Sequence, residues 1–124
     1  GMAEKEIEVV NTAKKKLWLP TSMDQRVRIM HGHELKGSSK FPGGHAYNIA
    51  CRLGCNVHIG HTHRLGLLAG VAGNKEVFGV EGGYLGDHNQ SAFDFMGPAR
   101  PPWTQAWAVY DTSKKENPYP TFVR

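Results

Sequence analysis

The sequence predicts an α/β fold in which one strand–helix–strand crossover builds a mixed sheet and a β-rich part follows. Two short apolar runs, residues 27–30 and 56–59, have the length and composition of buried strands. Between them, residues 45–53 carry apolar side chains at helical spacing and end before Gly54, a residue typical of helix C-termini. A helical crossover makes the two strands parallel, and we expect neighbouring strands and a right-handed connection, so that their carboxyl ends share one edge of the sheet.

The first twenty residues predict a packed amphipathic helix. Acidic residues at positions 4, 6 and 8 precede lysines at positions 14–16, an order that suits the helix dipole. Ile7, Val10 and Leu17 define one possible buried stripe, and Pro20 ends the helix. Gly1 before Met2 is typical of an expression-tag remnant.

Beyond Gly70 the pattern predicts strands and turns. Residues 73–76 are expected to form a turn that leads into a strand at 77–80. Residues 104–110 alternate as a strand does, and residues 119–123 are a candidate partner strand. We expect Trp103 and Trp107 to pack in the core or in an interface.

Length and composition indicate one small domain over residues 1–124, with the helix at 1–20 and the remainder at 27–124. The chain is 40% hydrophobic, enough apolar material for a modest core. Cys51 and Cys55 make no disulfide framework, and no apolar run approaches the roughly 20 residues needed to cross a bilayer, so we expect a cytoplasmic protein without a membrane contact. A net charge of +4 is weak evidence for nucleic-acid binding, and no nucleic-acid motif accompanies it.

Histidines gather directly after the two predicted parallel strands. Four of the seven lie in His31-Gly32-His33 and in Gly60-His61-Thr62-His63. Since ligands bind at the carboxyl edge of such sheets, neutral imidazoles of His31, His61 and His63 are expected to converge there on one metal ion. The alternative is that these histidines only satisfy hydrogen bonds in loops. Glu81 and Asp87 are conceivable local carboxylates, but nothing in the sequence places them at the site.

The order of these motifs resembles a known family. A strand ending in His-Gly, a later strand ending in Gly-His-x-His and a further strand that runs into a Gly-rich turn occur here at residues 31–32, 60–63 and 77–83. Residues 27–87 therefore resemble the C-terminal half of a calcineurin-like metallophosphoesterase. The resemblance implies half of an αββα sandwich and a divalent ion such as Mn, Fe, Zn or Ni.

The resemblance also implies roles for the histidines. His31 and His61 would bind one ion of a two-metal site, and His63 would bind the other. His33 would stand near the substrate phosphate or behind the ligands. The isolated chain is expected to hold one ion or none.

The family's remaining motifs are missing before His31. No Asp-x-His, Gly-Asp-x-x-Asp or Gly-Asn-His-Asp occurs there, and Asp24 matches none of them. Without a bridging carboxylate, two adjacent cations would repel each other, so a complete two-metal centre is not expected and no catalytic residue is assigned. Half of the sandwich would also leave an apolar sheet face, which predicts a homo-oligomer or a protein partner.

Two classes of function follow. The first is a truncated relative, catalytically deficient alone, that acts through self-association or partner binding. The alternative is a metal-dependent phosphomonoesterase or phosphodiesterase completed by a second subunit or chain. Four basic residues near the metal edge could attract a phosphorylated ligand: Lys36, Lys40, Arg52 and Arg64. For residues 35–40, a flexible solvated loop is the favoured interpretation.

Overall fold

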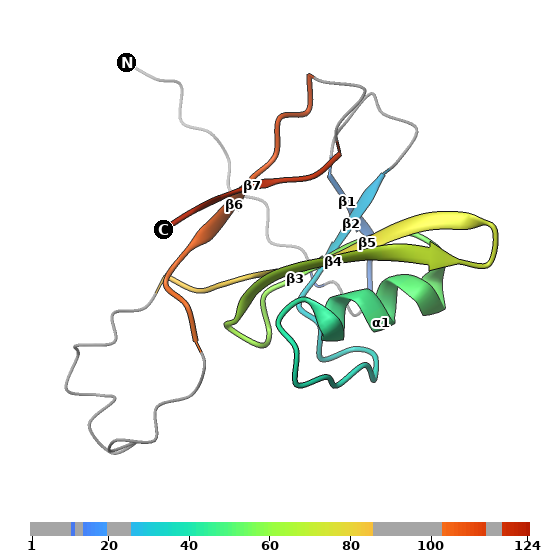
Figure 1. Cartoon of the computed structure of the whole chain (residues 1–124), viewed down its shortest axis with the longest axis horizontal. Coiled ribbons are helices and arrows are strands. Elements are labelled where there is room, and N and C mark those ends of the chain that lie inside the picture. The colour runs from blue at the N-terminus through green and yellow to red at the C-terminus, as the bar shows by residue number, and fades with distance from the viewer. Residues whose placement is uncertain (1–10, 12–13, 20–25, 86–102, 114–117) are drawn as a thin grey trace.

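The computed structural model describes residues 11, 14–19, 26–85, 103–113 and 118–124, and it is a mixed α/β structure (Figure 1). A five-stranded sheet has the order β1-β2-β3-β5-β4, and a separate two-stranded sheet pairs β6 with β7. The elements are β1 (Leu17–Trp18), β2 (Val27–Met30), α1 (Gly44–Leu53), β3 (Asn56–Ile59), β4 (Leu65–Ala72), β5 (Lys75–Gly82), β6 (Trp107–Val109) and β7 (Thr121–Val123). No helix in the described part of the chain is long and apolar enough to cross a membrane.

The predicted crossover is confirmed. β2 and β3 are parallel neighbours, with Met30 opposite Ile59 at their carboxyl ends. The connecting α1 ends at Gly54, whose N–H donates to the carbonyl of Ala50 at 2.8 Å. β5 joins the other side of β3 in parallel, whereas β4 pairs with β5 antiparallel, so the sheet is mixed.

One face of the sheet packs against α1, which lies beside the strands in Figure 1. Gly79 on β5 makes this close approach possible, because a Cβ at that position would clash with the backbone of Ala46 and Tyr47. The apolar side chains that meet there are fully or almost fully buried: Met30, Ala46, Ile49, Ala50, Val57, Ile59 and Val77.

The opposite face carries a second, smaller cluster of Val27, Phe78 and Val80. Partly buried side chains from β4 and from segments near both ends of the described chain pack against it: Leu19, Leu67, Tyr110 and Phe122. The apolar face that the sequence predicts to be open is therefore covered at these three residues by the chain itself.

The predicted N-terminal helix fails where the structure describes it. Leu17, expected on the helical stripe, lies in β1 and pairs antiparallel with Ile29 of β2. The open edge of β2 offers backbone hydrogen bonds to a neighbouring strand, and this tertiary pairing overrides the local helical pattern. Residues 1–10, 12–13 and 20, on which the rest of that prediction falls, lie outside the described residues.

Two of the observed strands, β1 and β4, were not predicted from the sequence, and the other five lie at or within the predicted regions. In β4, Gly66 and Gly70 interrupt the alternation of apolar and polar residues that predicts a strand. These glycines make room for Pro42, which precedes α1, and for Tyr47 of α1. β5 begins at Lys75, so the turn is shorter than the predicted 73–76. The C-terminal strands pair antiparallel as expected but are shorter than predicted.

Candidate metal centre

The histidine clusters lie at the carboxyl edge of the parallel strands. His31 directly follows β2, and Gly60 and His61 directly follow β3. The carbonyl of His31 accepts hydrogen bonds from the backbone N–H groups of Gly60 at 3.2 Å and His61 at 2.9 Å. The two loops are thus joined at their first residues, as the parallel pairing predicts.

Gly32 lets the first loop turn back onto the second. Its φ of 113° lies in the region that favours glycine, and a Cβ there would stand 3.0 Å from Ile59 and 3.2 Å from the Cβ of His61. The N–H of Gly32 donates to Oε1 of Glu34 at 2.7 Å, which turns this carboxylate toward the histidines. Any larger residue at position 32 would therefore separate the two histidine loops.

His31, His33 and Glu34 form a compact set of possible ligands. One ligand atom from each lies within 4.8 Å of the other two. The Nδ1 atoms of His31 and His33 are 2.9 Å apart, and Nδ1 of His33 is 3.0 Å from Oε1 of Glu34. Either a proton on one of the imidazole nitrogens or a bound cation can link atoms this close, and without one of them their lone pairs would repel one another.

His61 completes a rim with this set. Its ring centroid lies 4.7 Å from that of His31 and 6.4 Å from that of His33. Partial burial lowers the pKa of His61, and the positive charge that neighbouring histidines acquire on protonation, His31 foremost, lowers it further. A lowered pKa favours the neutral imidazole, which is the form that binds metals.

His45, the second residue of α1, lies behind this rim. Its ring centroid is 6.2 Å from that of His61, and its Nε2 is buried without a hydrogen-bond partner. Buried polar atoms normally have partners, so this nitrogen lacks a group that would satisfy it. Position 45 is the first residue of the helix predicted over 45–53, and the approach of His45 to His61 becomes visible only in the fold.

His63 lies in a different environment from the rim. Its ring stacks on Tyr84 at a centroid distance of 5.3 Å and meets the edge of Trp103 at 4.7 Å. Its backbone φ of 57° turns the chain at this point, and its Nδ1 is buried without a hydrogen-bond partner. The structure thus brings His31 and His61 together and places the ring of His63 among aromatic side chains.

Glu81 is the buried carboxylate below the rim, and its oxygens are already engaged. Oε1 accepts hydrogen bonds from Thr62 Oγ1 at 2.5 Å and from Arg64 Nε at 2.9 Å, with Arg64 Nη2 at 2.7 Å. Oε2 accepts from the backbone N–H of His45 at 3.1 Å. Glu81 therefore positions the loop after β3 against the start of α1, and the carboxylate near the histidines is Glu34.

Sequence reasoning missed Glu34, although its place next to His33 offered a signal. Asp87, the other carboxylate considered, lies outside the described residues. Of the basic residues, Arg64 is held by Glu81 and by the carbonyl of Ser39, and Arg52 lies in the last turn of α1, the helix end away from the rim. Lys36 and Lys40 are the exposed cations of the loop that follows the rim.

Comparisons of the chain with protein-family models, with curated proteins and with solved structures found no match.

Proposed function

We propose that the protein binds one divalent transition-metal ion at the rim formed by His31, His33, Glu34 and His61. The observation that carries the proposal is the convergence of two imidazole nitrogens and one carboxylate oxygen within 4.8 Å at the joined ends of β2 and β3. A cation bound among these atoms would take the place of the proton that otherwise links them. His61 stands beside His31 as a further imidazole ligand.

The ligand chemistry narrows the identity of the ion. Imidazole and carboxylate together suit zinc, manganese, iron or nickel, whereas calcium and magnesium prefer oxygen ligands alone. His31, His33 and His61 are exposed, so solvent or a ligand can reach an ion held there. Structural zinc sites are closed by four protein ligands, and an accessible rim is typical of a site with an open position.

We further propose that the described fold is half of a metallophosphoesterase-like sandwich. The support is the order of the elements: β2 ends at His-Gly, β3 ends at Gly-His-x-His, and β5 runs next to β3 into a Gly-rich turn. In the two-metal arrangement that this family implies, His63 belongs to the second ion, so binding of a single ion at the rim does not need it. With only this half of the sandwich, the chain acts by self-association or by binding a partner.

The alternative function is hydrolysis of phosphoric esters in an assembly that supplies the missing carboxylates. The exposure of the rim favours it, because a buried ion could not reach a substrate. A bound divalent ion would act there as a Lewis acid toward a phosphoryl oxygen. Lys36 and Lys40 would attract the phosphate from the adjoining loop.

Metal titration tests the first proposal. Isothermal titration calorimetry with Zn²⁺ at pH 7, on tag-free protein, should show one site per chain. His31→Ala and Glu34→Gln should each weaken binding at least tenfold because each removes a ligand atom, whereas His58→Gln, on the other face of the sheet, should bind normally. Equal Zn²⁺ affinity in His31→Ala and the unmodified chain would contradict the proposal.

A second variant examines His63 separately. His63→Asn keeps a residue that tolerates a positive φ and removes the imidazole. Its Zn²⁺ affinity should equal that of the unmodified chain if the single ion lies at the rim. A loss as large as that of His31→Ala would instead assign His63 to the same ion.

Hydrolysis is measured with a generic phosphodiester and added Mn²⁺. Turnover that His61→Ala abolishes would support the enzymatic alternative. Absence of turnover in the metal-loaded chain, with the metal site intact by calorimetry, would support the binding function.

A further inference from the structure

β4 is an edge strand of an unusual composition. In the part of the chain that the structure describes, β5 is its paired neighbour and its other side has no partner strand. Its sequence, Leu65 to Ala72, contains no charged residue and no proline, the devices that normally protect an open edge. None of its residues is buried, whereas Val77–Glu81 of the adjoining β5 are all buried.

The turn between β4 and β5 determines which backbone groups point outward. Ala72 and Lys75 are paired across Gly73-Asn74, and the φ of 64° at Gly73 suits a two-residue hairpin turn. The pair that flanks such a turn exchanges both backbone hydrogen bonds, and the bonded pairs then alternate along the ladder. The N–H and C=O groups directed away from β5 therefore belong to Leu65, Leu67, Ala69 and Val71.

We propose that two copies of this chain pair antiparallel through β4, with Leu68 of each copy facing the other across a two-fold axis. This register lets all four outward residues exchange backbone hydrogen bonds with the second copy. Leu65 then faces Val71 of the second copy, and Leu67 faces Ala69. Gly66 faces Gly70, so the two glycines of the strand lie opposite each other.

Self-complementarity is the reason to assign a second copy as the occupant. From Leu65 to Val71 every facing pair in this register is apolar or glycine, and Ala72 faces Arg64. No like charges meet, although the chain carries a net charge of +4. Arg64, directly before the strand, has its guanidinium held inward by Glu81 and is 11% exposed. Leu68 and Val71, which are 39% and 64% exposed, would lose much of this exposure.

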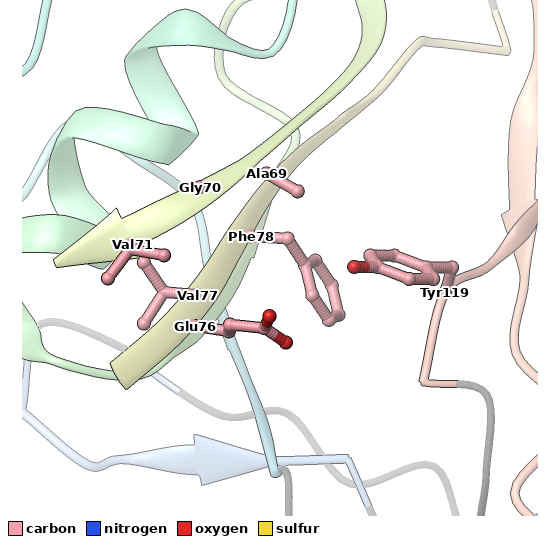
Figure 2. Close-up of a pocket in the computed structure, with 7 residues that line it drawn as sticks. All are labelled: Ala69, Gly70, Val71, Glu76, Val77, Phe78 and Tyr119. Atoms are coloured by element: carbon pink, nitrogen blue, oxygen red, sulfur yellow. The ribbon is translucent and has the colours of Figure 1, made fainter. Parts of the chain in front are cut away.

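A hollow lies beside the end of β4 that is next to the turn at Gly73, and it has room for a side chain of the second copy. It measures about 210 Å³, and its lining includes Ala69, Val71, Phe78 and Tyr119 together with the carboxylate residue Glu76. Figure 2 shows the rings of Phe78 and Tyr119 side by side next to this strand, and their planes are tilted by 48°. Leu65 of the second copy, opposite Val71, would lie on the same side of the sheet as this hollow, because facing residues in an antiparallel pair share one face.

Sedimentation measures the assembly directly. Analytical ultracentrifugation of metal-free protein should give a concentration-dependent dimer. Leu68→Lys should be monomeric because it places two ammonium groups opposite each other on the axis, and Val109→Lys, at a comparably exposed position of β6, should still dimerise. A monomeric unmodified chain, or a dimer that persists in Leu68→Lys, would overturn the proposal and leave the edge to another protein or to solvent.

A cross-linking pair tests the register and covers the case in which Leu68→Lys fails to fold. In a Cys51→Ser/Cys55→Ser background, Leu68→Cys should form a disulfide-linked dimer on oxidation, since facing Cα atoms of a non-hydrogen-bonded pair lie about 4.5 Å apart. Val71→Cys should not, because its copies would be about 20 Å apart along the strand. Equal cross-linking of both variants, or of neither, would refute this register. Metal binding enters neither measurement, so the two proposals fail independently.

Discussion

At the residue scale, Glu81 links β5 by side-chain hydrogen bonds both to the loop after β3 and to the start of α1. Its fully buried carboxylate accepts hydrogen bonds from Thr62, Arg64 and the first turn of α1. Arg64 in turn donates from Nη1 to the carbonyl of Ser39 at 2.8 Å. The loop after β3 and the start of the helix are therefore positioned by one buried ion pair, and the imidazole of His61 depends on that loop.

Glu81→Gln should destabilise the fold strongly. The substitution preserves the shape of the side chain but removes the negative charge that faces the nearly buried guanidinium of Arg64. Breaking a buried ion pair in this way lowers the free energy of unfolding by about 3–5 kcal/mol. Urea unfolding followed by circular dichroism measures the change. Glu76→Gln, an exposed carboxylate on the same strand, should change the free energy of unfolding by less than about 0.5 kcal/mol. Equal unfolding midpoints for the two variants would show that the pair contributes nothing.

At the scale of elements, the distance between α1 and the sheet is limited by Gly79. A Cβ there would meet the N of Tyr47 and the carbonyl carbon of Ala46, both backbone atoms that no side-chain rotation can move away. The helix lies this close because its small residues, Ala46 and Ala50, face the strands. The start of α1, with His45, is thereby held next to the rim.

Gly79→Ala should push the helix off the sheet. Overpacking of this kind costs about 1–3 kcal/mol, and the backbone contact places this site at the upper end. Gly60→Ala is the matched control, because a Cβ at Gly60 meets nothing within 4 Å and its φ is not positive. Thermal unfolding compares the two variants. If Gly79→Ala unfolds at the same temperature as Gly60→Ala, the helix can move away from the sheet without a loss of stability.

At the scale of the whole molecule, the two sheets meet through contacts between aromatic and histidine side chains. Nδ1 of His58 on β3 lies 2.8 Å from the hydroxyl of Tyr110, which follows β6. Phe78 of β5 lies 5.0 Å from Tyr119, which precedes β7. These contacts attach the β6–β7 hairpin to the face of the main sheet opposite α1.

The attachment should weaken in acid. Burial lowers the pKa of His58 to about 4, whereas the unfolded chain has a histidine pKa near 6.5. The unfolded state therefore binds more protons between these values, and stability should fall as the pH drops from about 6.5 to 4, by about 3 kcal/mol from this residue.

The pH profile of urea unfolding checks this. The unmodified chain should lose stability over that range, and His58→Gln should lose less, because it removes the proton uptake of one residue and leaves the other histidines in place. Identical slopes for the two chains would assign the acid sensitivity to other groups.

The sequence by itself determined the parallel pair β2 and β3, the helix between them and the meeting of His31 with His61. Those features follow from local signals: the period and length of the apolar runs, Gly54 at the helix end and the rule that parallel strands share a carboxyl edge. The metallophosphoesterase resemblance remains a proposal that these motifs support.

Only the tertiary structure decided which other side chains join the rim and which surface stays open. Glu34 reaches the histidines through the backbone turn at Gly32, and the ring of His63 packs on Tyr84 and Trp103, a contact with a distant segment. β1 replaced the end of the expected helix, and the apolar edge of β4 came from a strand whose glycines hide its pattern. The spacing of apolar residues predicts which side chains of a segment are buried, but it does not predict which distant segment packs beside them. The positions of His63, β1 and β4 depend on such contacts between distant segments.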